Sequence, residues 1–268
     1  MKSCLICDSQ NIDIYEKNVM KCSDCVSFFR SEPNDSKKHY WNPDEKFSSV
    51  NLSKKITNSF TYSLFHDYVA EEYVNYLKEK TSFSFKNSLD IGSNYGNFVK
   101  KLHDTDVDAY GVEAAYDFYS LSKLKNKIIH SYFDDTFPTD KKYDLISLTQ
   151  MIYYSPDPIN ILKHVKKLLN KVGLIFIATF NPDSSSFKEK RFPIFELSHY
   201  NQLISKKGFK ALNKIGLDLV DYSSYKPNLF LDTFNKNKLN FLNYVLKFKK
   251  PYIPDSDGFH AFVLLKHA

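Results

Sequence analysis

The stretch Leu89-Asp90-Ile91-Gly92-Ser93-Asn94-Tyr95-Gly96-Asn97-Phe98 predicts a buried strand, then a glycine turn, then the start of a helix. Asp90 stands at the carboxyl end of the strand. Gly92 and Gly96 let the backbone come close to a ligand where a Cβ would block it. We therefore expect a nucleotide-like cofactor to bind at this turn.

Strand and helix patterns alternate on the carboxyl-terminal side of this turn. Such alternation predicts βαβ units and a parallel sheet, with ligands at the carboxyl ends of the strands. The predicted fold class is α/β, with a Rossmann-like, seven-stranded, mostly parallel sheet and helices on both faces. The other strands are expected at 107–113, 127–130, 143–148, 174–180, 217–222 and 259–265, and helices at 117–124, 158–169 and 203–215.

The loops after the next two strands carry side chains suited to a nucleoside. Glu113 ends the second strand, where a carboxylate can accept hydrogen bonds from both ribose hydroxyls. Tyr132, Phe133 and Asp134 follow the third strand, where aromatic rings could enclose a purine and the acid could accept from its exocyclic amine. The order of these residues predicts a nucleoside site along one edge of the sheet.

A nicotinamide dinucleotide fits this pattern poorly, because its fingerprint needs glycine at positions 92, 94 and 97 and the last two are Asn94 and Asn97. The pattern acid-x-Gly-x-x-x-Gly, with an acid ending the next strand, resembles the class I S-adenosylmethionine-dependent methyltransferases. The resemblance runs from about residue 87 to residue 180. It includes the strand 143–147, the helix start at 155–158, and 171–175 opening the fifth strand.

The resemblance implies a role for each matching position. The first loop would hold the methionine part of the cofactor, Glu113 the ribose, and the segment 132–134 the adenine. The implied cofactor residues are Asp90, Gly92, Asn94, Gly96, Glu113, Tyr132, Phe133, Asp134, Thr149 and Gln150. Two positions depart from the family pattern: Asn94 replaces a usual third glycine, and Tyr154 stands where many small-molecule members have histidine. No Asn-Pro-Pro-aromatic motif follows the fourth strand, which argues against methylation of adenine N6 or glutamine.

All four cysteines fall in the first 25 residues as two CxxC pairs, Cys4 with Cys7 and Cys22 with Cys25. This spacing predicts a structural Zn²⁺ site in a small ribbon, with a pair of disulfides or a redox CxxC as the alternatives. Residues 1–45 hold six Lys or Arg and eight Asp or Glu, which disfavours phosphate binding. We expect the ribbon to act as a folding clamp or a wall of the substrate site.

The expected domains are a zinc ribbon at 1–45, a helical linker at 46–82 and a methyltransferase domain at 83–268. Apolar residues at helical spacing predict a helix from Phe60 to Lys80 in the linker. Residues 31–44 are expected as a loop, and 181–194 as a lid over the site. An insertion at 223–258, with a helical middle at 229–248, is basic and aromatic and could contact substrate.

The composition sets wide limits. The formal net charge is +6 and 43% of the residues are hydrophobic, which suits a globular chain and gives weak evidence for an anionic partner. No apolar run approaches the length of a membrane span, and no signal-peptide core opens the chain, so a cytoplasmic location is expected. Neither the oligomeric state nor the acceptor atom can be read from the sequence.

Methyl transfer from a sulfonium requires positioning, and an oxygen or carbon acceptor also requires a base. The candidates are His199, Tyr153 and Tyr154, whereas His66, beside the apolar face of the linker helix, is expected to be a packing residue. The ribbon with this domain resembles zinc-ribbon methyltransferases of polysaccharide and natural-product pathways, which implies a small-molecule or carbohydrate acceptor for O- or C-methylation. Alternatives are an RNA methyltransferase, with nucleic acid the less favoured partner, and a non-catalytic binding module.

Overall fold

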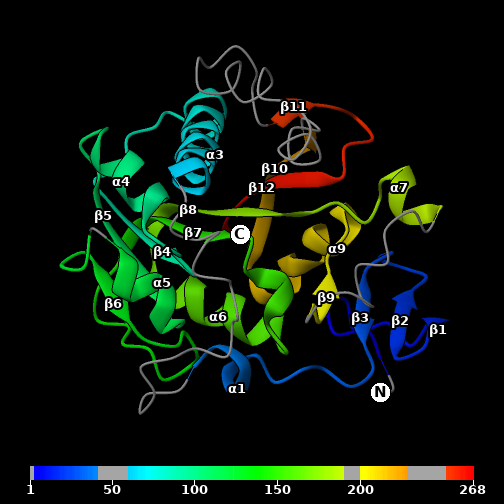
Figure 1. Cartoon of the computed structure of the whole chain (residues 1–268). Helices are drawn as coiled ribbons and strands as arrows, with labels where there is room; N and C mark the ends of the chain where they lie inside the picture. Colours follow the sequence, from blue (N-terminus) through cyan, green and yellow to red (C-terminus); the bar gives the residue numbers. More distant parts are fainter. Residues whose placement is uncertain (1–2, 42–59, 123, 190–199, 228–251) are drawn as a thin grey trace.

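The computed structural model describes residues 3–41, 60–122, 124–189, 200–227 and 252–268. Within these ranges the central sheet has the order β11-β10-β12-β8-β7-β4-β5-β6 (Figure 1). Neighbouring strands from β8 to β6 are parallel, whereas β12 is antiparallel to both β8 and β10. The strands are β4 (Asn87–Ile91), β5 (Asp108–Glu113), β6 (Ile128–His130), β7 (Tyr143–Thr149), β8 (Leu169–Phe180), β10 (Leu217–Pro227), β11 (Tyr252–Pro254) and β12 (His260–His267).

This arrangement confirms the predicted fold class and adds one strand to it. The additional strand, β11, pairs with the end of β10 at the edge of the sheet. Strand β11 and the last residues of β10 fall within the segment 223–258, which the sequence predicted to be an insertion. The ends of that segment therefore extend the sheet. The helical middle expected at 229–248 lies outside the described residues.

Helices cover both faces of the sheet because its strands alternate their apolar side chains. In β8, Ile175 and Ile177 belong to one core cluster, and Phe176 between them belongs to another. Helices α3 (Phe60–Lys80) and α4 (Asn97–His103) pack into the cluster with Phe176. The opposite face is covered by α6 (Pro158–Leu168), α9 (Lys206–Lys210) and the 3₁₀ helix η2 (Ala211–Ile215).

The sheet of the amino-terminal ribbon includes one strand from a distant part of the sequence. Its strands β1 (Ile12–Glu16), β2 (Val19–Cys22) and β3 (Phe28–Arg30) are joined by β9 (Gln202–Leu203), which pairs antiparallel with β3. The two parts approach closely, since a Cβ on Gly208 would lie 2.4 Å from Ser27 Oγ. In Figure 1 the ribbon lies on the right of the molecule, and β5 and β6 lie on the left.

Two elements differ from the prediction in this region. The helix expected at 203–215 begins only at Lys206, because Leu203 pairs with the ribbon and the Ser205 hydroxyl caps α9 by accepting from the Gly208 N–H at 2.9 Å. The loop expected at 31–44 contains the short helix α1 (Ser36–Tyr40), with Asp35 as its amino-terminal cap.

The remaining short elements lie in the loops of the large sheet. They are α5 (Tyr116–Leu121), the 3₁₀ helix η1 (Ile152–Tyr154) and α7 (Ser185–Lys188). Part of the expected lid, at 190–194, falls outside the described residues. None of the described helices is both long and apolar enough to cross a membrane.

Candidate active site

A cavity of about 510 Å³ opens at the carboxyl ends of the central strands. Its walls come from the loops after β4, β5, β6 and β7, and from α1 and α3. Eight of the ten residues predicted to bind the cofactor line it, namely Asp90, Gly92, Asn94, Glu113, Tyr132, Phe133, Thr149 and Gln150. Its volume is in the range of small-molecule sites.

The turn after β4 has the backbone that the sequence predicted. Gly92 and Gly96 have φ of 75° and 83°, and a Cβ on Gly96 would lie 2.6 Å from Ile128 Cδ1. Gly96 does not line the cavity, so its requirement is structural. Asn94 also has a positive φ of 53°, a region that asparagine tolerates better than most residues, and its Oδ1 accepts from the Tyr95 N–H at 2.8 Å. This geometry explains how asparagine can replace a third glycine.

Glu113 is held in place by the backbone of two loops. Its Oε2 accepts from the Asn94 N–H and its Oε1 from the Ala115 N–H, both at 2.7 Å. Burial raises the pKa of Glu113 to about 7, although these N–H groups oppose the shift. Each carboxylate oxygen keeps a second lone pair for a ligand hydroxyl.

Asp90 is a second buried acid at the base of the cavity. Burial raises its pKa to about 7, and the hydrogen bond from the Ser147 hydroxyl, at 2.6 Å, opposes that shift. The two acids make the cavity favourable for a cationic ligand such as a sulfonium.

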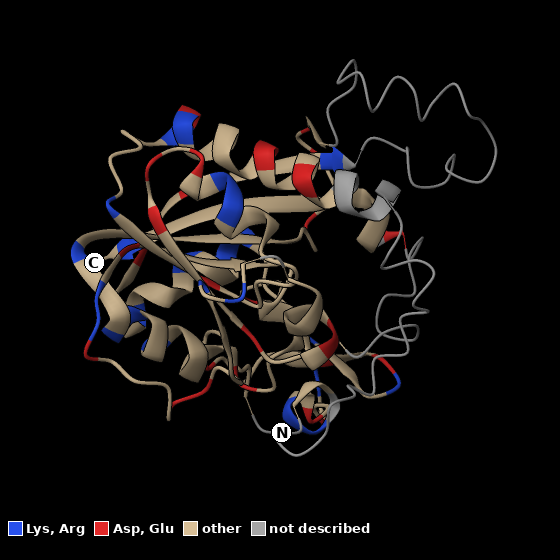
Figure 2. Cartoon of the chain, turned by 60° about the vertical axis from the view of Figure 1, so that its left-hand side comes forward, with Lys and Arg blue, Asp and Glu red and all other residues tan. Residues whose placement is uncertain are grey.

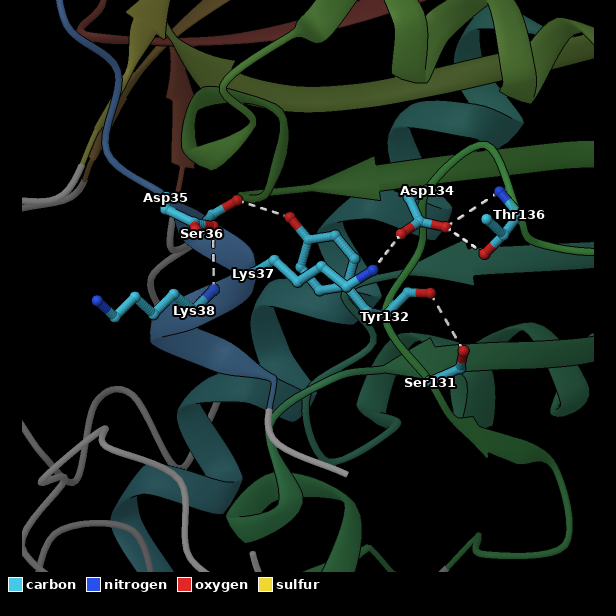
Figure 3. Close-up of polar contacts among 8 residues, drawn as sticks. All are labelled: Asp35, Ser36, Lys37, Lys38, Ser131, Tyr132, Asp134 and Thr136. Atoms are coloured by element: carbon cyan, nitrogen blue, oxygen red, sulfur yellow. Dashed lines mark hydrogen bonds and ion pairs between the residues drawn. The ribbon is translucent and has the colours of Figure 1, made fainter. Parts of the chain in front are cut away.

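The three residues after β6 diverge. Phe133 and Tyr132 line the cavity, and the Tyr132 hydroxyl lies 2.6 Å from Ser36 Oγ of α1. Asp134 does not line the cavity, and Figure 3 shows its carboxylate turned toward Lys37 and Thr136. Its carboxylate binds Lys37 Nζ at 2.7 Å and accepts from the Thr136 N–H at 3.0 Å.

Four tyrosines form a wall where α1 meets the loop after β7. The rings of Tyr40 and Tyr154 are 5.3 Å apart, and those of Tyr153 and Tyr200 are 4.5 Å apart. Burial raises the pKa of Tyr40 to about 12 and those of Tyr153 and Tyr154 well above their usual range. The phenols therefore stay protonated at neutral pH, where they can orient an acceptor by hydrogen bonding.

Helices α1 and α3 supply cavity residues that the sequence reasoning missed. His66 lines the cavity beside Tyr73, and burial lowers the pKa of His66 to about 4, so its imidazole is neutral at physiological pH. The helical spacing of α3 predicted a buried face but gave no sign that one end of it meets a ligand. Among the described residues no Lys or Arg lines the cavity. His199 lies outside the described residues.

The four cysteines gather as the spacing predicted. All four Sγ atoms lie within 4.8 Å of one another, and the pairs Cys4–Cys25 and Cys7–Cys22 are 3.6 Å apart. The edge of a tetrahedral zinc–thiolate site is about 3.8 Å, from its Zn–S distance of about 2.3 Å. The cluster therefore fits a closed, structural Zn²⁺ site.

The sheet has this strand order, an acid (Asp90) just before the glycine turn that follows β4, and a second acid (Glu113) at the end of β5. Together these features define a class I S-adenosylmethionine-dependent methyltransferase. A family model described as a methyltransferase domain matches residues 62–222, more than half of the chain. The chain belongs to this family, as the sequence resemblance predicted.

Individual relatives are distant. A ubiquinone biosynthesis O-methyltransferase of Hydrogenovibrio crunogenus is 23% identical over 122 residues, covering 42% of this chain and 51% of its own. A tRNA U34 carboxymethyltransferase of Nautilia profundicola is 25% identical over 116 residues, 39% of this chain and 38% of its own. The chain thus spans about half or less of the length of these relatives.

The solved structures agree on the fold. Magnesium protoporphyrin IX methyltransferase from Synechocystis PCC 6803, solved with bound S-adenosylhomocysteine, superposes with a TM-score of 0.52 at 11% identity. The match covers 80% of this chain and 92% of that one. At this identity the likeness supports the architecture only.

Proposed function

We propose that this enzyme transfers the methyl group of S-adenosylmethionine to an oxygen or carbon atom of a small molecule or a sugar precursor. The observation that carries the proposal is the character of the cavity wall. Among the described residues the wall holds two buried acids and several neutral tyrosines, with no Lys or Arg to meet a phosphate. Such a wall suits a cationic cofactor and an uncharged acceptor better than a nucleic acid.

The proposed cofactor position follows the loops. The turn at Gly92 and Asn94, with Asp90 beneath it, would hold the methionine part. Glu113 would accept hydrogen bonds from the ribose hydroxyls through its remaining lone pairs, and the rings of Tyr132 and Phe133 would lie against the adenine.

We also propose that Cys4, Cys7, Cys22 and Cys25 bind a structural Zn²⁺. Four thiolates would complete the tetrahedron and leave no position open for a substrate. The ion would hold the ribbon in the shape that pairs β3 with β9, next to the tyrosine wall.

The proposed catalytic roles combine residues of the tyrosine wall with His199, which the sequence indicates. His199 remains the proposed base, with Tyr153 and Tyr154 orienting the acceptor. We expect His199→Ala to lower turnover far more than it lowers cofactor affinity, because a base acts only on the chemical step. Equal losses in both would contradict this role. His66, the histidine that lines the described cavity, is the alternative base, and His66→Gln provides the comparison.

RNA remains the second candidate acceptor, on two observations. One relative is named as a tRNA-modifying enzyme, and five of the chain's lysines fall within residues 228–251. The described residues, in contrast, hold 25 Lys or Arg against 27 Asp or Glu. In the view of Figure 2, basic and acidic residues are interspersed along the described part of the chain.

The test is the fate of a labelled methyl group. Purified protein would be incubated with methyl-labelled S-adenosylmethionine and a cell extract separated into RNA and metabolite fractions. We expect label in the metabolite fraction, and much less there with Glu113→Gln, the variant with weakened cofactor binding, as the matched control. Label confined to RNA would overturn the small-molecule proposal. Label in neither fraction would also contradict it.

A further inference from the structure

Helix α1 contacts the loop after β6 through three successive polar and aromatic contacts. Ser36 Oγ lies 2.6 Å from the Tyr132 hydroxyl, and Lys37 Nζ lies 2.7 Å from Asp134 Oδ2 and 5.4 Å from the centre of the Tyr132 ring (Figure 3). The Trp41 ring, directly after the helix, is 4.9 Å from that of His130. The helix is thus fixed on the segment expected to hold the adenine.

The chain that leads from the amino-terminal ribbon to α1 is also fixed at its ribbon end. Arg30 Nε donates to the Tyr200 carbonyl at 2.7 Å, and the Asn34 N–H donates to Asn201 Oδ1 at 2.6 Å. Asn201 in turn donates to the Tyr154 carbonyl at 2.7 Å. Residues 30–41 therefore run from the ribbon to β6, and Figure 1 shows α1 between them.

The position of residues 30–41 changes which residues can recognise the nucleoside. Asp134 was expected to accept from the adenine amine, but it does not line the cavity, and its carboxylate is paired with Lys37 and Thr136. Ser36 and Tyr40, both from the amino-terminal segment, line the cavity instead. Ser36 is 6% exposed, and its hydroxyl lies 2.6 Å from that of Tyr132, which also lines the cavity.

We propose that α1 is a wall of the cofactor site, with Ser36 and Tyr132 contacting the nucleoside where Asp134 cannot. Cofactor binding then requires α1 to be docked on the loop after β6, and the Lys37–Asp134 ion pair is one of the contacts that favour the docked position. The proposal rests on the proposed function only for the position of the cofactor in the cavity. It makes residues before the matched methyltransferase region part of the cofactor site.

The first test compares two lysines of the same helix. The Lys37 and Asp134 side chains are 52% and 21% exposed, so their pair is worth little and is screened by salt. We expect Lys37→Ala to weaken S-adenosylhomocysteine binding about two- to fivefold at low salt. The effect should shrink at high salt and vanish in an Asp134→Ala background. Lys38→Ala, the matched control, removes the same charge and should bind as the wild type. In Figure 3 the dashed line to Lys38 ends on its backbone N–H, which donates to Asp35, and none ends on its Nζ.

A second test addresses the buried contact. Ser36→Ala should weaken S-adenosylhomocysteine and adenosine by similar factors, because both carry the nucleoside that Ser36 would touch. Affinities of Lys37→Ala and Ser36→Ala equal to that of the wild type would overturn the proposal.

The single tryptophan of the chain reports on α1 directly. Trp41 emission should change on S-adenosylhomocysteine titration with the midpoint found by calorimetry, and Lys37→Ala should shift both midpoints together. Emission that is unchanged at saturating ligand would contradict the role of α1. Failure of the wild-type protein to bind S-adenosylhomocysteine would instead refute the proposed function. The docking of α1 could then still be compared between the unliganded wild type and Lys37→Ala by their Trp41 emission.

Discussion

Glu113→Gln tests the cofactor site most sharply among single substitutions, because the shape is kept and the charge is removed. In the wild type both carboxylate oxygens accept from backbone N–H groups, those of Asn94 and Ala115. Glutamine can accept only one of these bonds, and its NH₂ group would face the other N–H. It would also lose the charged acceptor proposed for the ribose hydroxyls.

A hydrogen bond to a charged group contributes about 1.5–3 kcal/mol. Loss of that amount weakens binding about ten- to a hundredfold, at roughly 1.4 kcal/mol per factor of ten. The assay is calorimetric titration with S-adenosylhomocysteine at pH 8, with the thermal midpoint of each variant measured alongside. Glu79→Gln, at the exposed end of α3, is the matched control and should bind as the wild type. A folded Glu113→Gln protein that binds within twofold of the wild type would refute the reasoning.

Three further predictions concern pH, backbone and metal. Burial raises the pKa of Asp90 and Glu113 to about 7, so the stability they contribute to the unliganded protein is present below pH 4 and is lost as the pH rises through 7. Cofactor affinity should instead rise from pH 6 to 8, with release of protons that calorimetry in two buffers measures. An affinity that does not change with pH would contradict this. Gly96→Ala should lower the free energy of unfolding by about 2–4 kcal/mol in urea, from its positive φ and the contact with Ile128, and an unchanged midpoint would exclude that strain. Cys22→Ser should lose zinc by elemental analysis, Ser23→Ala should retain it, and equal zinc contents would argue against the site.

The large sheet could be predicted because its signals are local. The alternating patterns predicted β4, β5, β6, β7, β8, β10 and β12, and the spacing from Asp90 to Glu113 brought two acids to one edge. Helix α3 covers the predicted range, and it ends at the predicted residue, Lys80.

The departures come from contacts between distant parts of the chain. Nothing within residues 201–204 indicates that β9 pairs with β3, more than 170 residues earlier. Helix α1 was hidden in a segment rich in Pro, Asn and Ser, because its signals are one Asp35 cap and the contacts of Ser36 and Lys37 with another loop. Asp134 was assigned to adenine because the sequence does not show Lys37 beside it.

The measurement that tests the account most directly is a crystal structure of the protein with S-adenosylhomocysteine. We expect the ligand in the cavity, its ribose hydroxyls on the Glu113 carboxylate and its adenine between Tyr132 and Phe133, with Ser36 of α1 in contact. A ligand bound elsewhere, or one whose ribose does not contact Glu113, would contradict it.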